Sequence, residues 1–150
     1  MMADDKDILI LDALKKNARA SVLEIAKETG LPNTTVHNRI KKLKKDKVIE
    51  GYTIRINPQK IGKKIAAYIS ITVDYQTLKK QKQTQKQLAE KIAKTPGVIE
   101  TDIITGGSDI LVKVRLKNIE ELNKFVTETL RNLDGVEKTE TMVILKEAID

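Results

Sequence analysis

Residues 32–47 read PNTTVHNRIKKLKKDK, and this stretch decides how the N-terminal part of the chain folds. Val36, Ile40 and Leu43 recur at i, i+4 and i+7, the spacing that lines apolar side chains along one face of a helix. The opposite face carries polar and basic side chains, namely Thr34, Asn38, Lys41 and Lys45. Pro32 suits a first helical turn, where its missing N–H is not needed. The stretch therefore predicts one helix with a buried apolar face and a basic outer face.

An amphipathic helix is expected upstream, over residues 4–17. Ile10 and Leu14 lie four positions apart, with Ile8 and Leu11 as further apolar positions. Three aspartates near its start suit the positive end of a helix. This pattern predicts a first helix that packs on the basic one.

A shorter helix is predicted between these two. Ser21 and Glu24 have the spacing of a capping box, in which each side chain bonds the backbone of the other residue. Gly30 is placed to end this helix in a left-handed conformation. A short helix, a tight turn and a second helix with an exposed polar face form a helix-turn-helix.

The net charge of +7 is distributed unevenly along the chain. Residues 1–60 hold 13 Lys and Arg against 8 Asp and Glu, whereas residues 61–150 hold 15 against 13. Residues 39–47 alone hold six basic residues and one acidic residue. A local basic patch of this kind favours a polyanionic partner, either nucleic acid or an anionic membrane.

The stretch KVIEGYTIRINP, residues 47–58, predicts a strand or small wing, with a bend at Gly51. Its alternating apolar positions are Ile49, Tyr52, Ile54 and Ile56. Residues 57–62 read as a linker, so the expected domains are 1–60 and 61–150.

The second part has the pattern of strands alternating with helices. Residues 65–73 alternate apolar and polar side chains, as a strand does. A helix is predicted within 78–94, although residues 79–87 are too polar to show where it begins. The remaining elements are expected as a strand at 98–105, a turn at GGSD, a strand at 110–116, a helix at 118–133 and a strand at 136–145.

A weak internal repeat supports this order. TPGVIET at 95–101 and LDGVEKT at 133–139 each follow a helix and open a strand. Two strand-helix-strand copies predict a βαββαβ, ferredoxin-like sheet with its helices on one face. The other face would expose apolar side chains, so a second copy of the chain is expected to cover it.

On these residues the chain resembles the Lrp/AsnC family of feast/famine transcription regulators. The resemblance rests on ILDALKKNARAS, LEIAKETGLPNTTVHNRIKKL, VIEGYTIRINPQKIG, GVIETDIITGGSDILVKV and GVEKTETMVIL. It implies an α+β chain, with an N-terminal winged helix-turn-helix domain followed by a ferredoxin-like βαββαβ regulatory (RAM) domain. It also implies homodimers, often assembled into octamers, that bind pseudo-palindromic promoter DNA and a free amino acid held between dimers.

Double-stranded DNA is the partner expected for the basic helix. Its lysines would attract backbone phosphates, and short hydrogen-bonding side chains near its N-terminus would reach base edges. The candidate contacts are Asn33, Thr34, Thr35, His37, Asn38, Lys41, Lys42 and Lys45. Lysines on a helix also form ordinary solvated faces, and Arg39 could pair with a carboxylate of its own domain or contact DNA.

The resemblance places the amino-acid effector at the loop after the second regulatory strand. The candidate residues are Thr101, Asp102, Thr105, Gly106, Gly107, Ser108 and Asp109. Gly106 and Gly107 would let backbone amides approach a carboxylate, and Asp109 or Asp102 could take the ammonium. Gly-Gly-Ser-Asp is also ordinary turn chemistry, and the same loop can be both.

Other classes of protein fit less well. The chain has no cysteine and one histidine, so we expect neither a disulfide nor a metal site, and no cofactor besides the amino acid. It has no apolar run of the roughly 18 residues that a membrane span needs, and no signal peptide, so a cytoplasmic protein is expected. It shows no nucleophile and base pair that would indicate an enzyme. The alternative is an architectural DNA-binding protein with weak sequence preference and no effector.

Overall fold

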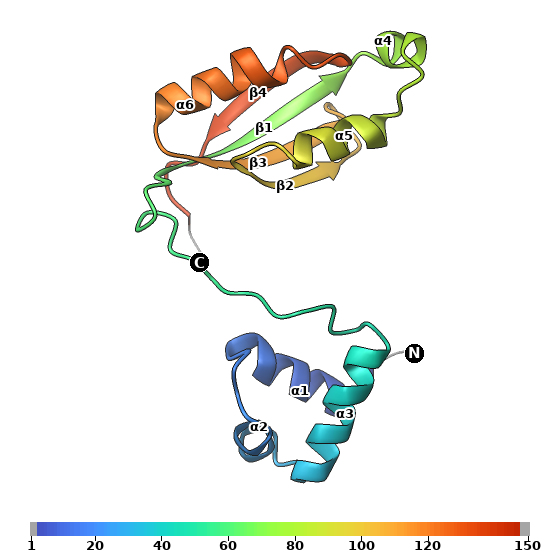
Figure 1. Ribbon diagram of the computed structural model, residues 1–150, viewed down its shortest axis with the longest axis vertical. Coiled ribbons are helices and arrows are strands. Elements are labelled where there is room, and N and C mark those ends of the chain that lie inside the picture. Colours follow the sequence, from blue (N-terminus) through green and yellow to red (C-terminus); the bar gives the residue numbers. More distant parts are fainter. Residues whose placement is uncertain (1–2, 148–150) are drawn as a thin grey trace. The chain divides into compact units, whose positions relative to one another are not determined.

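The computed structural model describes residues 3–147, and the chain divides into two compact units, Met1–Ile56 and Asn57–Asp150 (Figure 1). The first unit holds three helices, α1 (Asp5–Lys16), α2 (Val22–Thr29) and α3 (Asn33–Lys45). Ser21 and Glu24 form the predicted capping box of α2, and Gly30 ends that helix with φ of 70°. The predicted helix-turn-helix is therefore confirmed.

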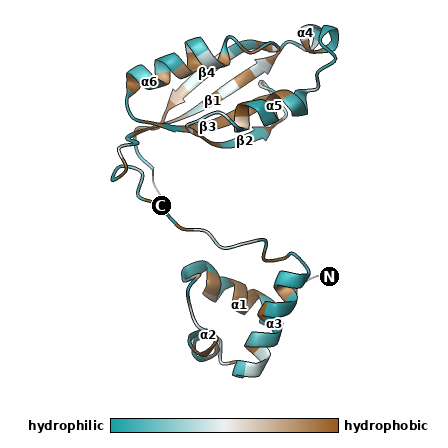
Figure 2. Cartoon of the chain, in the orientation of Figure 1, coloured by the Kyte–Doolittle hydropathy of each residue, from teal (hydrophilic) through white to brown (hydrophobic). Residues whose placement is uncertain are grey.

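Apolar side chains from all three helices meet in one core. Figure 2 marks the hydrophobic residues of these helices in brown. Val36 and Leu43 are fully buried, and Ile40 packs against the core from a half-buried position. Ile10 and Leu14 are also buried, as the pattern of the first helix predicts. Ile8 is 47% exposed, so its apolar character did not indicate burial.

The strand expected within residues 47–58 is not formed in the single chain. Residues 50–57 run extended without strand pairing, and Tyr52, Ile54 and Ile56 are 48%, 78% and 53% exposed. A strand requires a neighbouring backbone to satisfy its N–H and C=O groups, which alternation in the sequence cannot supply. Ile49 packs against the helical core and anchors the start of this segment.

The second unit contains one antiparallel sheet in the order β2-β3-β1-β4. Its strands are β1 (Ile65–Val73), β2 (Val98–Ile103), β3 (Ile110–Leu116) and β4 (Val136–Val143). Its helices are α4 (Tyr75–Lys80), α5 (Gln85–Ala93), α6 (Ile119–Lys124) and the π-helical η1 (Phe125–Leu130). In Figure 1, α5 and α6 lie on one face of the sheet, and α4 lies beyond the end of β1. This βαββαβ arrangement confirms the ferredoxin-like prediction.

The helix predicted within 78–94 is confirmed as α5, and its start, which the sequence left open, lies at Gln85; the separate short helix α4 before it was not predicted. Asp74 caps α4 by accepting hydrogen bonds from the amides of Gln76 and Thr77. Thr84 then caps α5 in a second capping box with Gln87. Each cap starts its own helix, so the polar stretch between them forms a turn.

The two faces of the sheet differ in their cover. The face under the helices carries Ile69, Ile71, Val112 and Val114, all fully buried. The opposite face, called the open face below, carries Ala66, Tyr68, Ser70, Thr72, Leu111, Lys113 and Arg115. The segment after β4 contacts this face, where Glu147 pairs with Lys113 and Arg115.

Candidate nucleic-acid interface and effector loop

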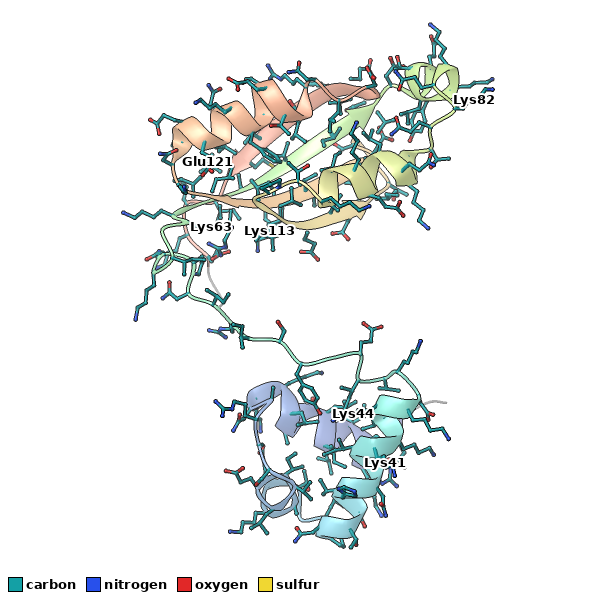
Figure 3. The ribbon with its side chains drawn as sticks, in the orientation of Figure 1. Lys41, Lys44, Lys63, Lys82, Lys113 and Glu121 are labelled. Atoms are coloured by element: carbon teal, nitrogen blue, oxygen red, sulfur yellow. The ribbon has the colours of Figure 1, made fainter. Side chains whose placement is uncertain are left out.

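The outer face of α3 presents polar and basic side chains to solvent. Asn33, Thr34, His37, Asn38, Lys41, Lys42 and Lys45 are exposed, and Thr35 is half-buried. Figure 3 shows Lys41 on the outer side of the helix, away from the helical core. Because Val36 and Leu43 are buried on the other side, the helix is held with its polar face outward.

The first turn of α3 keeps its backbone donors available. Pro32 occupies the N-cap position and supplies no side-chain hydrogen bond to these amides. The first amides of a helix carry partial positive charge and favour anions. The start of α3 can therefore donate hydrogen bonds to a DNA phosphate.

Arg39 pairs with carboxylates of its own unit, which resolves the two alternatives left open by the sequence. Its Nη1 lies 2.6 Å from both carboxylate oxygens of Asp4 and 2.9 Å from Oδ1 of Asp7. Asp7 is only 3% exposed. Arg39 therefore connects the middle of α3 to the start of α1.

The same contacts shift the pKa values of Asp4 and Arg39. The hydrogen bond from Arg39 lowers the pKa of Asp4 below its ordinary value of 3.8, and the amide of Asp7 lowers it further. The two carboxylates in turn raise the pKa of Arg39. Asp4 and Arg39 therefore both stay ionised at neutral pH.

The end of α3 is a tight turn stabilised by backbone bonds. The amide of Lys47 donates to the carbonyl of Lys44 at 3.2 Å, and the amide of Val48 donates to the carbonyl of Leu43 at 2.9 Å. Lys47 adopts a left-handed conformation, with φ of 55°. This pair of bonds is the Schellman motif of a helix end.

Lys44 has a contact that the sequence did not indicate. Its Nζ lies 5.0 Å from the centroid of the Tyr52 ring, within the range of a cation–π interaction. The contact brings residues eight positions apart together across the turn, and neither helical nor strand periodicity relates them. Lys44 is thereby drawn toward the extended segment.

Asp109, the first candidate for binding an ammonium, is engaged within its own domain. Its Oδ2 accepts a hydrogen bond from the amide of Val73 and its Oδ1 one from the hydroxyl of Tyr75, both at 2.8 Å. Its carbonyl accepts a bond from Gln85 Nε2 at 3.1 Å. The hydrogen bond to Asp109 raises the pKa of the Tyr75 hydroxyl, and burial adds to the shift. Asp109 thus holds the loop to the end of β1 and to the starts of α4 and α5.

The other loop residues are more open. Asp102, Thr105, Gly106 and Gly107 are exposed, whereas Ser108 is half-buried. A Cβ built on Gly106 or Gly107 would meet nothing within 4 Å, and Gly106 has φ of 116°. These glycine amides lie beside open space, where a small molecule can approach them.

Thr101 stands apart from the other candidates. Its register partner on β3 is Val112, which faces the helices. Its Oγ1 is buried and is the one such side-chain oxygen without a hydrogen-bond partner among residues 3–147. Asp102, its neighbour, is the partner of Leu111 and lies on the open face. The structure thus brings Asp102 and residues 105–107 to an accessible surface, but directs Thr101 inward.

Sequence reasoning missed Tyr75 and Gln85 as supports of the loop. They lie 34 and 24 positions from Asp109 along the chain. No spacing rule for helices, strands or turns relates residues so far apart.

Within residues 3–147, no group of three or more His, Cys, Asp or Glu side chains is placed to hold a metal ion. Within the same part of the chain, no helix has the length and hydropathy required to cross a membrane.

Comparison with known families agrees with this architecture. Residues 66–150 match the Lrp/AsnC ligand binding domain, and residues 4–50 match the winged helix-turn-helix DNA-binding domain. An uncharacterized HTH-type transcriptional regulator of Pyrococcus furiosus is 44% identical over 142 residues, covering 95% of this chain and 92% of the relative. The HTH-type transcriptional regulator FL11 of the same organism is 40% identical over 143 residues, covering 95% and 89%.

Solved structures share the fold over the full chain. Escherichia coli AsnC is 27% identical with a TM-score of 0.85, covering 100% of this chain and 97% of that one. A Neisseria meningitidis transcriptional regulator, solved in complex with L-Met, is 23% identical with a TM-score of 0.89, covering 99% and 94%. The fold and the exposed basic helix define a DNA-binding transcriptional regulator of the winged helix-turn-helix class. The chain belongs to the Lrp/AsnC family.

Proposed function

We propose that this protein binds pseudo-palindromic promoter DNA as a homodimer through α3, and that a free amino acid modulates this binding. In this scheme residues 1–60 contact DNA, and residues 61–150 bind the amino acid and assemble the subunits. The observation that carries the proposal is the orientation of α3. Val36, Leu43 and Arg39 hold it to its own unit, and seven of the eight candidate contacts face solvent.

The two ends of α3 suit different parts of the duplex. Short polar side chains such as Asn38 can read base edges in the major groove, and an Asn–adenine pair contributes about 1–3 kcal/mol of discrimination. Lys41, Lys42 and Lys45 lie further along the helix and suit backbone phosphates. Phosphate contacts raise affinity for every sequence and weaken as salt rises.

The DNA proposal is tested by two substitutions on the same helix face. Asn38→Ala should weaken binding to a selected site while leaving random duplex binding nearly unchanged. Lys45→Ala should weaken both and reduce the salt slope, log Kd against log salt, by about 0.9. Lys124→Ala, an exposed lysine of α6, serves as the control. Equal losses for both α3 variants on both duplexes would contradict the assignment.

The architectural alternative draws support from the six basic residues within residues 39–47. Such a protein would bind DNA with a steep salt dependence but without a preferred site. Selection from a random-sequence duplex library separates the two functions. Enrichment of a two-fold symmetric site supports the regulator, and no enrichment supports the alternative.

The effector would lie against residues 102–107. Amides of Gly106 and Gly107 would receive the carboxylate of the amino acid, and Asp102 would receive its ammonium. Asp102 is preferred over Asp109 because both carboxylate oxygens of Asp109 already accept hydrogen bonds. The L-Met complex of the Neisseria regulator provides a precedent within the same fold.

Melting the protein with each of the twenty amino acids tests this site. The effector should raise the melting temperature, because it binds the folded state. Asp102→Asn should remove that increase without changing the melting of the free protein, whereas Asp109→Asn should lower the melting temperature itself. No increase with any amino acid would rule out effector control.

A second subunit would complete the effector site. β2 is an edge strand, and the loop after it is exposed, so one chain surrounds the amino acid on one side only. Binding between dimers would then couple the amino acid to an assembly such as an octamer. A coupling free energy of about 1–3 kcal/mol is enough to shift the arrangement of the DNA-binding units.

A further inference from the structure

The turn after α4 repeats the turn after α3. Residues 43–48 read LKKDKV, and residues 78–83 read LKKQKQ. The first follows the candidate DNA-binding helix, and the second lies in the other unit. We call residues 43–48 the first basic corner and residues 78–83 the second basic corner.

The two corners have the same backbone hydrogen bonds. In the first, Lys47 N–H donates to Lys44 C=O at 3.2 Å and Val48 N–H to Leu43 C=O at 2.9 Å. In the second, Lys82 N–H donates to Lys79 C=O at 3.2 Å and Gln83 N–H to Leu78 C=O at 2.9 Å. Both corners are Schellman motifs.

The conformation of the third lysine is also shared. Lys47 and Lys82 have φ of 55° and 54°, and they are the two non-glycine residues with positive φ in the described chain, residues 3–147. The leucine that opens each corner is buried, with Leu43 1% and Leu78 2% exposed. The three lysines of the second corner therefore leave the backbone in the same directions as those of the first.

The second corner is the more basic of the two. Gln81 stands where the first corner has Asp46, and residues 75–89 contain no Asp or Glu. Lys79, Lys80 and Lys82 are exposed, and no carboxylate of the described residues lies within 4.0 Å of their Nζ atoms. Figure 3 shows Lys82 at the turn after α4, projecting away from the sheet.

Two caps keep this turn in place. Asp74 fixes the start of α4, and Thr84 with Gln87 fixes the start of α5. Leu78 anchors the corner in the core of the sheet domain. The lysines therefore project from a defined scaffold and lose less freedom on binding than they would on a loose tail.

We propose that Lys79, Lys80 and Lys82 form a second phosphate-binding surface that contacts the backbone of double-stranded DNA beside the site held by α3. The proposal rests on DNA binding by α3, which brings the duplex to the protein. Lysines act as point charges toward phosphates, so the second corner adds affinity without reading bases. The protected stretch of DNA should therefore be longer than the stretch that α3 contacts.

A purely structural role for these lysines makes a different prediction. Lysines near a helix C-terminus interact favourably with its carbonyls, which would explain Lys79 and Lys80 without DNA. Lys82 is not explained in this way, because glycine adopts a left-handed conformation more easily than lysine. Lys82→Gly therefore separates stability from DNA binding.

The main test compares two triple variants of the full chain on a long duplex that extends beyond the selected site on both sides. The corner variant combines Lys79→Gln, Lys80→Gln and Lys82→Gln. It should reduce the slope of log Kd against log salt by about 2 to 3, and its affinity should be about 10- to 100-fold lower near 0.1 M salt. The control combines Lys91→Gln, Lys117→Gln and Lys124→Gln, which remove equal charge from exposed positions of the same unit. It should leave the slope nearly unchanged.

Lys82→Gly should raise the melting temperature and still reduce the salt slope by about 0.9. An unchanged slope in the corner variant, or an equal loss in corner and control variants, would overturn the proposal. A duplex trimmed to the selected site separates this result from failure of α3. On that duplex, wild type and the corner variant should bind alike, while Lys45→Ala binds more weakly than either.

Discussion

Arg39 lies within the most basic stretch of the chain, yet its guanidinium faces its own unit. It bonds to Asp4, which caps α1, and to Asp7, which is buried. An unpaired buried carboxylate is unfavourable, so the arginine offsets the charge of Asp7 as well as connecting two helices. Basic residues on one helix therefore have separate tasks, with Arg39 orienting the surface that its neighbours form.

Replacing Arg39 by alanine should lower the melting temperature by several degrees and change its pH dependence. The folded pKa of Asp4 is lowered below 3.8, so the stability from this pair is present above about pH 4 and is lost as pH falls through the folded pKa. Melting of the wild type should therefore fall more steeply below pH 4 than melting of Arg39→Ala. Thermal unfolding followed by circular dichroism from pH 7 to about 2 measures both curves.

A matched control uses the other ion pair between helices of this unit. Lys16 bonds Glu28 at 2.7 Å, but both side chains are largely exposed, at 72% and 45%. Lys16→Ala should change the melting temperature little, because exposed ion pairs contribute little. If the melting temperatures of wild type and Arg39→Ala fall in parallel as the pH is lowered, the pKa of Asp4 does not depend on Arg39 and the prediction is wrong.

At this scale, sequence predicted which residues face outward but not what they touch. The stripe of Val36, Ile40 and Leu43 predicted the exposed face of α3, since helical periodicity is local. The partners of Asp109 could not be predicted, because the sheet brings Tyr75 and Gln85 to it from distant positions. Both carboxylate oxygens of Asp109 accept hydrogen bonds within its own domain, which is why the proposed effector site uses Asp102 instead.

At the scale of elements, predictions succeeded where a local cap fixes a boundary. Ser21 with Glu24 begins α2 as expected, and the helix expected at 118–133 begins as α6 behind Asn118, whose side chain accepts a hydrogen bond from the amide of Glu121. The division between α4 and α5 was missed because a lysine, rather than a glycine, adopts the left-handed conformation at residue 82. The strand predicted after α3 is not formed, because residues 50–57 pair with no neighbouring strand among the described residues.

The internal Gly-Val repeat has a structural basis. Gly97 and Gly135 have φ of 92° and 93°, and each precedes the strand that follows a helix. The carbonyl of Gly135 accepts the amide of Asp74 at 2.8 Å, and a Cβ on Gly135 would overlap the Leu78 side chain. Both conformation and packing therefore require glycine at residue 135.

Gly135→Ala should destabilise the second unit by about 2–4 kcal/mol, from left-handed strain plus overpacking against Leu78. Gly62→Ala is the matched control, because Gly62 has φ of 78° but nothing within 4 Å of a built Cβ. It should cost about 1 kcal/mol or less. Urea denaturation measures the difference, and equal losses at both positions would show that the contact with Leu78 has no cost.

At the scale of the whole molecule, the order of elements was predictable from the sequence, and the assembly stays a prediction. Two βαβ patterns and one repeat determine the sheet topology, because the connections leave few alternatives. The open face has no such internal partner. Its half-buried Tyr68, Ser70 and Leu111 lie on central strands β1 and β3, where a second sheet can pack.

If a second copy covers the open face, Ser70→Arg should separate the dimer. Ser70 lies in the middle of β1, with Leu111 and Glu140 as its cross-strand neighbours. Glu140 can pair with the new guanidinium in the monomer, so the subunit stays folded, whereas the interface would have to bury added bulk and charge. The dimer dissociation constant should rise about 100-fold or more, which sedimentation velocity over a dilution series measures.

Asn123→Arg adds the same charge at an exposed position of α6 and should leave the dimer intact. DNA affinity should fall only for Ser70→Arg, because separated subunits no longer bind the two half-sites of the DNA together. A Ser70→Arg protein that remains dimeric would place the interface elsewhere on the chain.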